Sequence, residues 1–540
     1  MYNNDWQNFV GQPVNRKRPQ RRLPVLVALV CVSVSATALG LGAPGRAYAQ
    51  NDRVGVNPAV TVVDDPSTTA TTTSTTTTTT PTITEPSSST TTAPVGPTAV
   101  PTTAGSVDAS STTSVPISIV SAVDPNSTTT IATAISTTST VTTKTTTAGR
   151  VTTSTRKPKT AAPARTVEEL QQRIDAILNP FPGVVGSISV DGVGAVYDRG
   201  ADKAVVPAST QKIYSIGAAL LRLGAEKRFV TDIRSSKIPS GATLDGDLVI
   251  RASGDPSFSS AGVAALADAV ARSGIRAVSG DLAVDDSHFD SQRTNDGWKT
   301  SFTPGEVGSL SAFTVNGNHQ SGKAALDPAI ANLALVRAAL VARGVIVRGG
   351  DRRGFLPLGG PVLGSVTSAP LRDLAAYALK KSENTYAELL LKELGASAGN
   401  GSTLGGLEIV RSQFAAFGVS APIMADGSGL SSLNRTTPRQ QVGWLTKLRS
   451  SNGAEEFRKS LPIACVDGTL KNRFCNTVGA GKIQAKTGTL DYVTGLTGYG
   501  VMPSGRVVVF SFIGNALSSS SRARAAIDAS LLVVLTSTVA

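Results

Sequence analysis

Apolar residues recur with a helix or strand period only in the part of the chain that begins near residue 166. Between residues 50 and 165 the sequence is dominated by Thr, Ser, Pro, Ala and Val, without either period and with few charges. A segment of this kind cannot bury enough apolar surface to offset its chain entropy. We therefore predict a disordered linker over residues 50–165, either an O-glycosylated stalk or an unmodified spacer.

The two ends of the patterned part predict pieces of the same sheet. A capping-box sequence at Thr166 and an apolar face that ends at Leu178 predict an opening helix. Alternating positions and turn residues predict strands over 184–190, 194–197, 493–501 and 507–513, and apolar spacing predicts a last helix over 525–535. Because a helix and strands open this part and strands and a helix close it, we predict one sheet built from both ends of the chain.

The middle of the patterned part has elements of its own. The pattern predicts strands over 248–252, 281–284 and 345–348, and helices over 261–272 and 330–342. We interpret residues 228–361 as a smaller inserted domain. Residues 166–227 and 362–540 then form the main domain, and the fold class is α/β.

The N-terminus has the three parts of an export signal. A basic run of Arg16, Lys17, Arg18, Arg21 and Arg22 precedes the apolar residues 23–43, and Ala47-Tyr48-Ala49 follows as a small-x-small cleavage site. We predict a signal over residues 1–49, cut after Ala49. The alternative is an uncleaved anchor, since about 21 apolar residues can span a bilayer. Either interpretation places the part of the chain that begins near residue 166 outside the cytoplasm.

The formal net charge of +13 does not indicate a nucleic-acid partner. Basic and aromatic residues are not interleaved in the sequence, and no recognition-helix pattern occurs. We therefore predict no nucleic-acid binding and interpret the basic charge as solvated surface or attraction to an anionic envelope.

Ser209 and Lys212 are the first candidates for chemistry. Pro207 is tolerated only at a helix start, and apolar residues at helical spacing follow it. The Lys212 amine therefore stands on the same helical face as the Ser209 hydroxyl, three residues away. Such a pair is a nucleophile and its base if the lysine is neutral. Lowering its pKa by about three units requires roughly 4 kcal/mol, from burial or from a second cation.

Two further clusters combine lysine with hydroxyl or amide groups. Ser382 and Asn384 stand in a segment that is predicted to open an apolar helix. Lys486-Thr487-Gly488-Thr489 comes just before a strand-rich stretch, and a glycine there would let a ligand backbone approach closely.

The histidine and cysteine inventory excludes other chemistries. The sequence has two histidines, His288 and His319, both in the predicted insertion. A Ser-His-Asp triad is therefore not expected. A zinc site is not expected either, because no Cys pair has ligand spacing. We predict a lysine base, with no metal and no cofactor.

Taken together, these motifs resemble a known family. Ser209-x-x-Lys212, Ser382-x-Asn384 and Lys486-Thr487-Gly488 look like the three signatures of penicillin-recognising serine enzymes. The segments 254–256 (GDP), 425–431 (ADGSGLS) and 466–470 (VDGTL) further resemble the D-alanyl-D-alanine carboxypeptidase/endopeptidase family, the low-molecular-mass class C penicillin-binding proteins. The likeness runs from about residue 166 to the C-terminus. The insertion looks shorter than in the larger members, and Cys465 stands where a small residue is expected.

The resemblance implies a fold and a reaction. The fold would be that of serine β-lactamases and penicillin-binding proteins, with an antiparallel sheet flanked by helices. Ser209 would attack the carbonyl between two D-alanines, Lys212 would take its proton, and Ser382 would relay a proton to the leaving amine. Water would release the acyl-enzyme, whereas β-lactams would acylate Ser209 and stay.

The resemblance also implies how the substrate is held. Asn384 would contact the substrate amide and Lys212. Lys486 would lower the pKa of Lys212 and, with Thr487, Gly488 and Thr489, would bind the terminal carboxylate. The N–H groups of Ser209 and Thr489 would form the oxyanion hole. The expected partners are peptidoglycan stem peptides, cut as a carboxypeptidase at D-Ala-D-Ala or as an endopeptidase at D-Ala-meso-diaminopimelate crosslinks.

Three questions stay open at the level of the sequence. A serine β-lactamase is one alternative, although no Glu-x-x-Leu-Asn occurs between Asn384 and Lys486. A catalytically inactive wall-binding module is another. Cys465 and Cys475 are either a disulfide, worth about 2–3 kcal/mol, or two free thiols.

Overall fold

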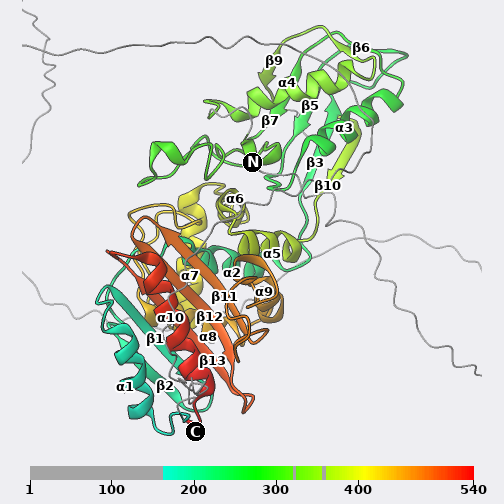
Figure 1. The fold of residues 1–540 in the computed structure, drawn as a ribbon. Helices are drawn as coiled ribbons and strands as arrows, with labels where there is room; N and C mark the ends of the chain where they lie inside the picture. Colours follow the sequence, from blue (N-terminus) through cyan, green and yellow to red (C-terminus); the bar gives the residue numbers. More distant parts are fainter. Residues whose placement is uncertain (1–161, 320–323, 356–359, 540) are drawn as a thin grey trace, which may run out of the picture. The chain divides into compact units, whose positions relative to one another are not determined.

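The structure is a computed structural model that describes residues 162–319, 324–355 and 360–539 (Figure 1). The predicted signal over residues 1–49 and all but the last four residues of the predicted linker lie outside the described residues. Among the described helices, none is both long and apolar enough to cross a bilayer.

The main sheet is assembled from both ends of the chain, as the sequence predicts. Its strand order is β11-β12-β13-β1-β2, and every neighbouring pair is antiparallel. The strands are β1 (Val184–Val190), β2 (Gly194–Arg199), β11 (Ile483–Leu490), β12 (Val493–Val501) and β13 (Val507–Gly514). β1 pairs with β13 from Val184↔Gly514 to Val190↔Val508, so the first and last strands of the fold lie side by side.

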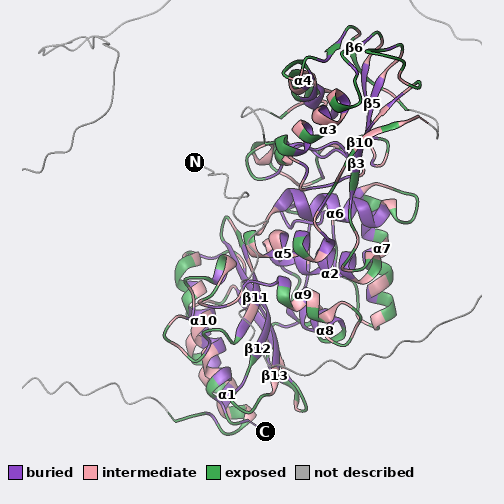
Figure 2. Cartoon of the chain, turned by 90° about the vertical axis from the view of Figure 1, so that its right-hand side faces the viewer, coloured by how far each residue is buried: buried purple, intermediate pink, exposed green. Residues whose placement is uncertain are grey.

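Helices cover both faces of this sheet, because neighbouring strand residues point to opposite sides. Phe510 packs with α1 (Val167–Leu178) and α10 (Ser520–Thr536), whereas Val509 packs with the helices of the other face. Figure 2 shows α1 and α10 on one side of the strands and the larger group of helices on the other. The opening helix begins as predicted, since the Thr166 hydroxyl accepts from the Glu169 N–H.

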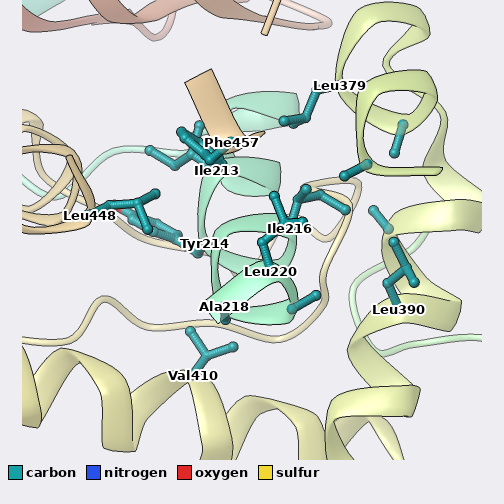
Figure 3. Close-up of a cluster of buried hydrophobic side chains, with 14 of the residues drawn as sticks. Ile213, Tyr214, Ile216, Ala218, Leu220, Leu379, Leu390, Val410, Leu448 and Phe457 are labelled. Atoms are coloured by element: carbon teal, nitrogen blue, oxygen red, sulfur yellow. The ribbon is translucent and has the colours of Figure 1, made fainter. Parts of the chain in front are cut away.

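The second layer is organised around α2 (Lys212–Leu223), which is buried from Lys212 to Leu220. Its apolar residues meet side chains from the surrounding helices, as Figure 3 shows for Ile213, Ile216 and Leu220. The surrounding helices are α5 (Leu371–Lys381), α6 (Asn384–Ala396), α7 (Thr403–Phe417), α8 (Pro438–Leu448) and α9 (Ala454–Ser460). The N-terminal part of α2 is thereby buried, and Ser209 lies just before it.

The middle of the chain forms a second sheet with its own apolar core. The strand order is β10-β3-β5-β7-β9, and its parallel part is covered by helices. The elements are β3 (Val230–Ser235), β5 (Leu248–Arg251), β7 (Leu282–Asp285), β9 (Asp351–Arg353), β10 (Val362–Thr367), α3 (Ser260–Arg272) and α4 (Pro328–Val341). A small parallel sheet joins β4 (Thr243–Leu244), β6 (Ala277–Val278) and β8 (Ile346–Val347).

The end of this middle part differs from the sequence-based boundary at residue 361. β10 pairs with β3 from Val362↔Arg234 to Thr367↔Val230, so it belongs to the second sheet. The chain returns to the main domain only at α5. The sequence pattern missed this strand because its residues alternate between exposed and half-buried positions, without a fully apolar face.

Candidate active site

Ser209 lies on a short 3₁₀ turn, Ala208–Gln211, that leads directly into α2. Ala208, the residue before it, is fully buried and has the positive φ of 50° that is rare outside glycine. The Thr210 hydroxyl donates to the Pro207 carbonyl oxygen at 2.8 Å and accepts from the Gln441 amide at 2.9 Å. The nucleophile candidate is therefore held in a constrained turn in which the Thr210 hydroxyl both donates and accepts.

The Lys212 amine has three oxygen partners. Its Nζ lies 3.0 Å from Ser209 Oγ, 2.6 Å from Asn384 Oδ1 and 2.7 Å from the Ser428 carbonyl oxygen. The last two oxygens can only accept, so they take the two hydrogens of a neutral amine. The lone pair then faces the Ser209 hydroxyl, which is the geometry of a general base and its nucleophile.

Burial makes this neutral form accessible. Lys212 is fully buried, which lowers its pKa from 10.5 to about 8. Four carboxylates oppose the shift in the order Asp426, Glu388, Glu383 and Glu306, because each stabilises the ammonium form. Desolvation outweighs all four.

Ser382 and Asn384 lie where two helices meet. Ser382 ends α5 in the left-handed conformation, with a φ of 62°, and Asn384 is the first residue of α6. The sequence analysis placed both residues at the start of one helix. In the structure they lie at the junction of α5 and α6, and this junction directs their side chains into the site. The Asn384 amide bridges two parts of the molecule, since its Oδ1 accepts from Lys212 and its Nδ2 donates to the Glu306 carbonyl oxygen at 2.8 Å.

Lys486 to Thr489 lie within the edge strand β11, not before a strand as the sequence suggested. The Lys486 amine donates to Ser382 Oγ and to the Thr487 carbonyl oxygen, both at 2.8 Å. Ile483 and Ala485 turn their backbone groups away from β12, toward residues 464 and 462. Alternation along an antiparallel strand directs the backbone groups of Thr487 and Thr489 to the same outer edge.

The pKa of Lys486 is also lowered, well below its usual value. Burial is the main cause, and the charge of Lys212 is the second. We expected Lys486 to lower the pKa of Lys212. Burial, the other cause that we considered, is the main cause of the lowered pKa of Lys212, and the repulsion between the two amines disfavours a state in which both are charged.

Gly488 has a structural role in addition to the predicted approach of a ligand backbone, which stays a prediction. A Cβ atom at this position would lie 2.8 Å from the Pro207 carbonyl oxygen, 3.1 Å from Thr210 Cγ2 and 3.3 Å from Ala208 Cβ. The glycine therefore lets the protein's own nucleophile turn approach the strand. This contact holds β11 against the Ser209 turn.

Two buried carboxyl groups beside Lys212 were not predicted. Glu388 and Asp426 have no exposed surface, and both surround the loop that presents the Ser428 carbonyl oxygen to Lys212. The sequence contains two signals for them. Glu388 is four residues after Asn384 on one helical face, and Asp426 precedes Gly427-Ser428-Gly429, a typical loop sequence that we quoted only for its resemblance.

The histidines and cysteines have other partners. His288 contacts Glu393 and His319 contacts the Pro304 carbonyl oxygen, so neither forms a pair with Ser209. In the described part of the chain, no three His, Cys, Asp or Glu side chains are grouped to hold a metal. Cys465 and Cys475 form a disulfide.

The disulfide closes a loop that reaches the site. Thr469 lies within this loop, and its hydroxyl is 2.9 Å from the Thr487 hydroxyl. The loop also contains Asp467, which accepts from the Lys380 amine at 2.6 Å and from the Ile463 N–H at 2.9 Å. The carboxylate-binding candidate Thr487 is thus supported from outside the strand.

A serine beside a buried lysine of lowered pKa, a Ser-x-Asn junction and a Lys-Thr-Gly edge strand of a five-stranded antiparallel sheet define a penicillin-recognising serine peptidase. The model of the D-Ala-D-Ala carboxypeptidase 3 (S13) family matches residues 166–319 and 305–537. The chain belongs to this family.

Individual relatives agree with this assignment. The chain is 30% identical over 439 residues to a D-alanyl-D-alanine carboxypeptidase of Actinomadura sp. (strain R39), covering 64% of this chain and 81% of that one. It is 28% identical over 403 residues to carboxypeptidase DacB of Mycolicibacterium smegmatis, covering 68% and 84%. The crystal structure of penicillin binding protein 4 (dacB) from Haemophilus influenzae superposes with a TM-score of 0.61 at 22% identity, covering 67% and 99%, and shows the same fold.

Proposed function

We propose that this protein is a serine DD-peptidase that cleaves the D-Ala-D-Ala end of peptidoglycan stem peptides through an acyl-enzyme on Ser209. The observation that carries the proposal is the set of contacts of the Lys212 amine, with two acceptor-only oxygens and the Ser209 hydroxyl at 3.0 Å. This arrangement supplies a reactive serine without histidine or metal. Hydrolysis of D-Ala-meso-diaminopimelate crosslinks uses the same bond chemistry and is part of the proposal.

The other motifs have matching roles. The Lys486 amine and the hydroxyls of Thr487 and Thr489 bind the free carboxylate of the substrate. Ser382, which accepts from the Lys486 amine, relays to the leaving amine the proton that Lys212 takes from Ser209. The outer edge of β11 offers its N–H groups to the substrate, and the Thr489 N–H with the Ser209 N–H holds the oxyanion. β-Lactams present the same carboxylate and carbonyl and acylate Ser209.

We propose further that the enzyme works outside the cytoplasm. The basic run, the apolar residues 23–43 and the small-x-small site support export, and residues 50–165 serve as a tether. The disulfide between Cys465 and Cys475 suits an oxidising compartment. Cell fractionation of the full chain, with and without residues 1–49, tests this proposal.

The decisive experiment maps the covalent adduct. Purified protein is labelled with a fluorescent penicillin and digested, and mass spectrometry locates the modified residue. We expect the label on Ser209 and no label in Ser209→Ala. An adduct on another side chain would refute the proposal.

Product analysis separates the activities. Loss of one D-alanine from a defined pentapeptide muropeptide indicates a carboxypeptidase, and conversion of a crosslinked dimer to monomers indicates an endopeptidase. Rapid turnover of nitrocefin in place of stable labelling would favour the β-lactamase alternative. If Ser209→Ala left the activity of the protein unchanged, the alternative of a catalytically inactive wall-binding module would be favoured.

A further inference from the structure

Glu388 is a buried carboxyl group for which the reaction described above has no use. It lies on α6 one turn after Asn384, and its side chain has no exposed surface. Its Oε1 accepts from the Ser428 N–H at 2.7 Å and from the Gly427 N–H at 3.1 Å. Its Oε2 accepts from the Asn295 amide at 2.8 Å.

All of these partners donate, so the group acts as an acceptor. Burial raises the pKa of Glu388, and the nearby Asp426 carboxylate raises it further. Burying a carboxyl group is unfavourable in itself, but an apolar side chain at this position would leave the buried N–H groups of Gly427 and Ser428 without this acceptor. The position therefore needs an explanation other than packing.

The loop whose N–H groups donate to Glu388 is also the loop that contacts the amine of Lys212. The Gly427 carbonyl oxygen accepts from the Ser215 hydroxyl at 2.8 Å, and the Ser428 carbonyl oxygen accepts from Lys212 at 2.7 Å. Asp426 fixes the rest of the loop through the N–H groups of Gly429 and Ser431, at 2.9 and 2.7 Å. Glu388 is thus one peptide unit away from an atom that binds the Lys212 amine.

This connection determines where the Lys212 lone pair points. A neutral amine has two hydrogens, and Asn384 Oδ1 and the Ser428 carbonyl oxygen accept them. Both acceptors depend on α6, the first directly and the second through Glu388. A shift of the Ser428 carbonyl oxygen would rotate the lone pair away from Ser209 Oγ.

We infer that Glu388 is a positioning residue that fixes the Gly427–Ser428 backbone and thereby aims the Lys212 lone pair at Ser209. The inference rests on the proposed function, in which Lys212 is the base for acylation. According to this inference, the important property of Glu388 is its reach, that is, the side-chain length that brings its carboxyl oxygen to the two N–H groups. Its charge is not required.

Two variants separate reach from charge. Glu388→Gln keeps the length, and its amide oxygen can accept from both N–H groups while Asn295 rotates its own amide to accept from the new NH₂. Glu388→Asp keeps the charge but withdraws the oxygens by about 1.5 Å, the length of one carbon–carbon bond. Glu393, a buried carboxylate on the same helix that pairs with Lys227 and His288, supplies the matched controls Glu393→Gln and Glu393→Asp.

The readout is stopped-flow acylation by a fluorescent penicillin, analysed as a binding constant K and an acylation rate constant k2, together with the melting temperature. For Glu388→Asp we expect k2 to fall by about 10²-fold, because a displacement near 1 Å at a catalytic group costs about that much. We expect K to be unchanged. Glu388→Gln should retain k2 within about tenfold of the wild type.

Three results would overturn the inference. One is an unchanged k2 in Glu388→Asp, another is an equal fall of k2 in Glu393→Asp, and the third is a lower k2 for Gln than for Asp. If Glu388→Asp fails to fold, Glu388→Gln still decides, because a k2 more than about 10²-fold below that of Glu393→Gln contradicts a role based on reach. Failure of the proposed function would be visible separately, as a wild-type protein that forms no adduct on Ser209.

Discussion

The substitution Asn384→Asp tests directly whether Lys212 must be neutral. The side chain keeps its shape, but the atom 2.6 Å from Nζ becomes part of a carboxylate. Two unit charges about 4 Å apart interact by about 4 kcal/mol at the effective dielectric constant of 20 that suits such sites. That energy corresponds to about three pKa units.

The pKa of Lys212 would therefore rise from about 8 toward about 11. Acylation requires the neutral amine, so rate is lost as the pH falls through the pKa. At pH 7 the neutral fraction drops from about one tenth to about 10⁻⁴, which predicts a loss of about 10³-fold. At pH 10 the wild type is at its plateau and the variant retains about one tenth of its own, so the loss shrinks to about tenfold.

The assay is the second-order rate constant for labelling by a fluorescent penicillin, measured from pH 6 to pH 10. The new carboxylate cannot donate to the Glu306 carbonyl oxygen, which lowers the rate at every pH. Asn384→Ala, which removes the amide without adding charge, measures this pH-independent part. A loss in Asn384→Asp that is equal at both ends of the pH range would refute the assignment of Lys212 as the base.

The remaining predictions concern the wild type and two structural contacts. The labelling rate of the wild type should fall on the acidic side with a midpoint near 8, the pKa of Lys212, and a midpoint below 6 in rapid-mixing experiments would exclude this lysine. Gly488→Ala should slow labelling by about tenfold, because its Cβ would lie 2.8 Å from the Pro207 carbonyl oxygen and push β11 away. Gly350→Ala, whose Cβ would meet Asp281 Oδ1 at an ordinary contact distance of 4.0 Å, serves as control and should label like the wild type. Cys465→Ser should lower the free energy of unfolding in urea by about 3 kcal/mol, and a change below about 1 kcal/mol would show that the loop between Cys465 and Cys475 is ordered without its crosslink.

The sequence predicted four of the five strands of the main sheet because these four have a strong apolar pattern, whereas β11 was not predicted. β1 and β12 have the predicted residues, and β13 extends the prediction by one residue. β10 was assigned to the wrong domain because its exposed residues have no such pattern and its partner β3 is far away in the sequence. Pairing of this kind depends on tertiary contacts, which local periodicity does not contain.

The candidate site shows the same division. Helical spacing alone predicted that Ser209 and Lys212 lie together. The contact of Asn384 with Lys212 was predicted only from the family resemblance. The contact of Gly488 with the nucleophile turn was not predicted, because the sequence does not say which face of its strand meets that turn. Glu388 was overlooked, since a glutamate on a helix is usually a solvated residue.

Pairing of β1 with β13 has a consequence for how the chain reaches its native state. Val184 finds its partner Gly514 only after more than three hundred further residues have been synthesised. During that time one side of β1 has no permanent neighbour and is open to association with other chains. Contacts this distant in sequence make folding slow. We expect the growing polypeptide to depend on a holding chaperone, and fragments that stop before residue 507 to aggregate although they contain Ser209, Lys212 and Lys486.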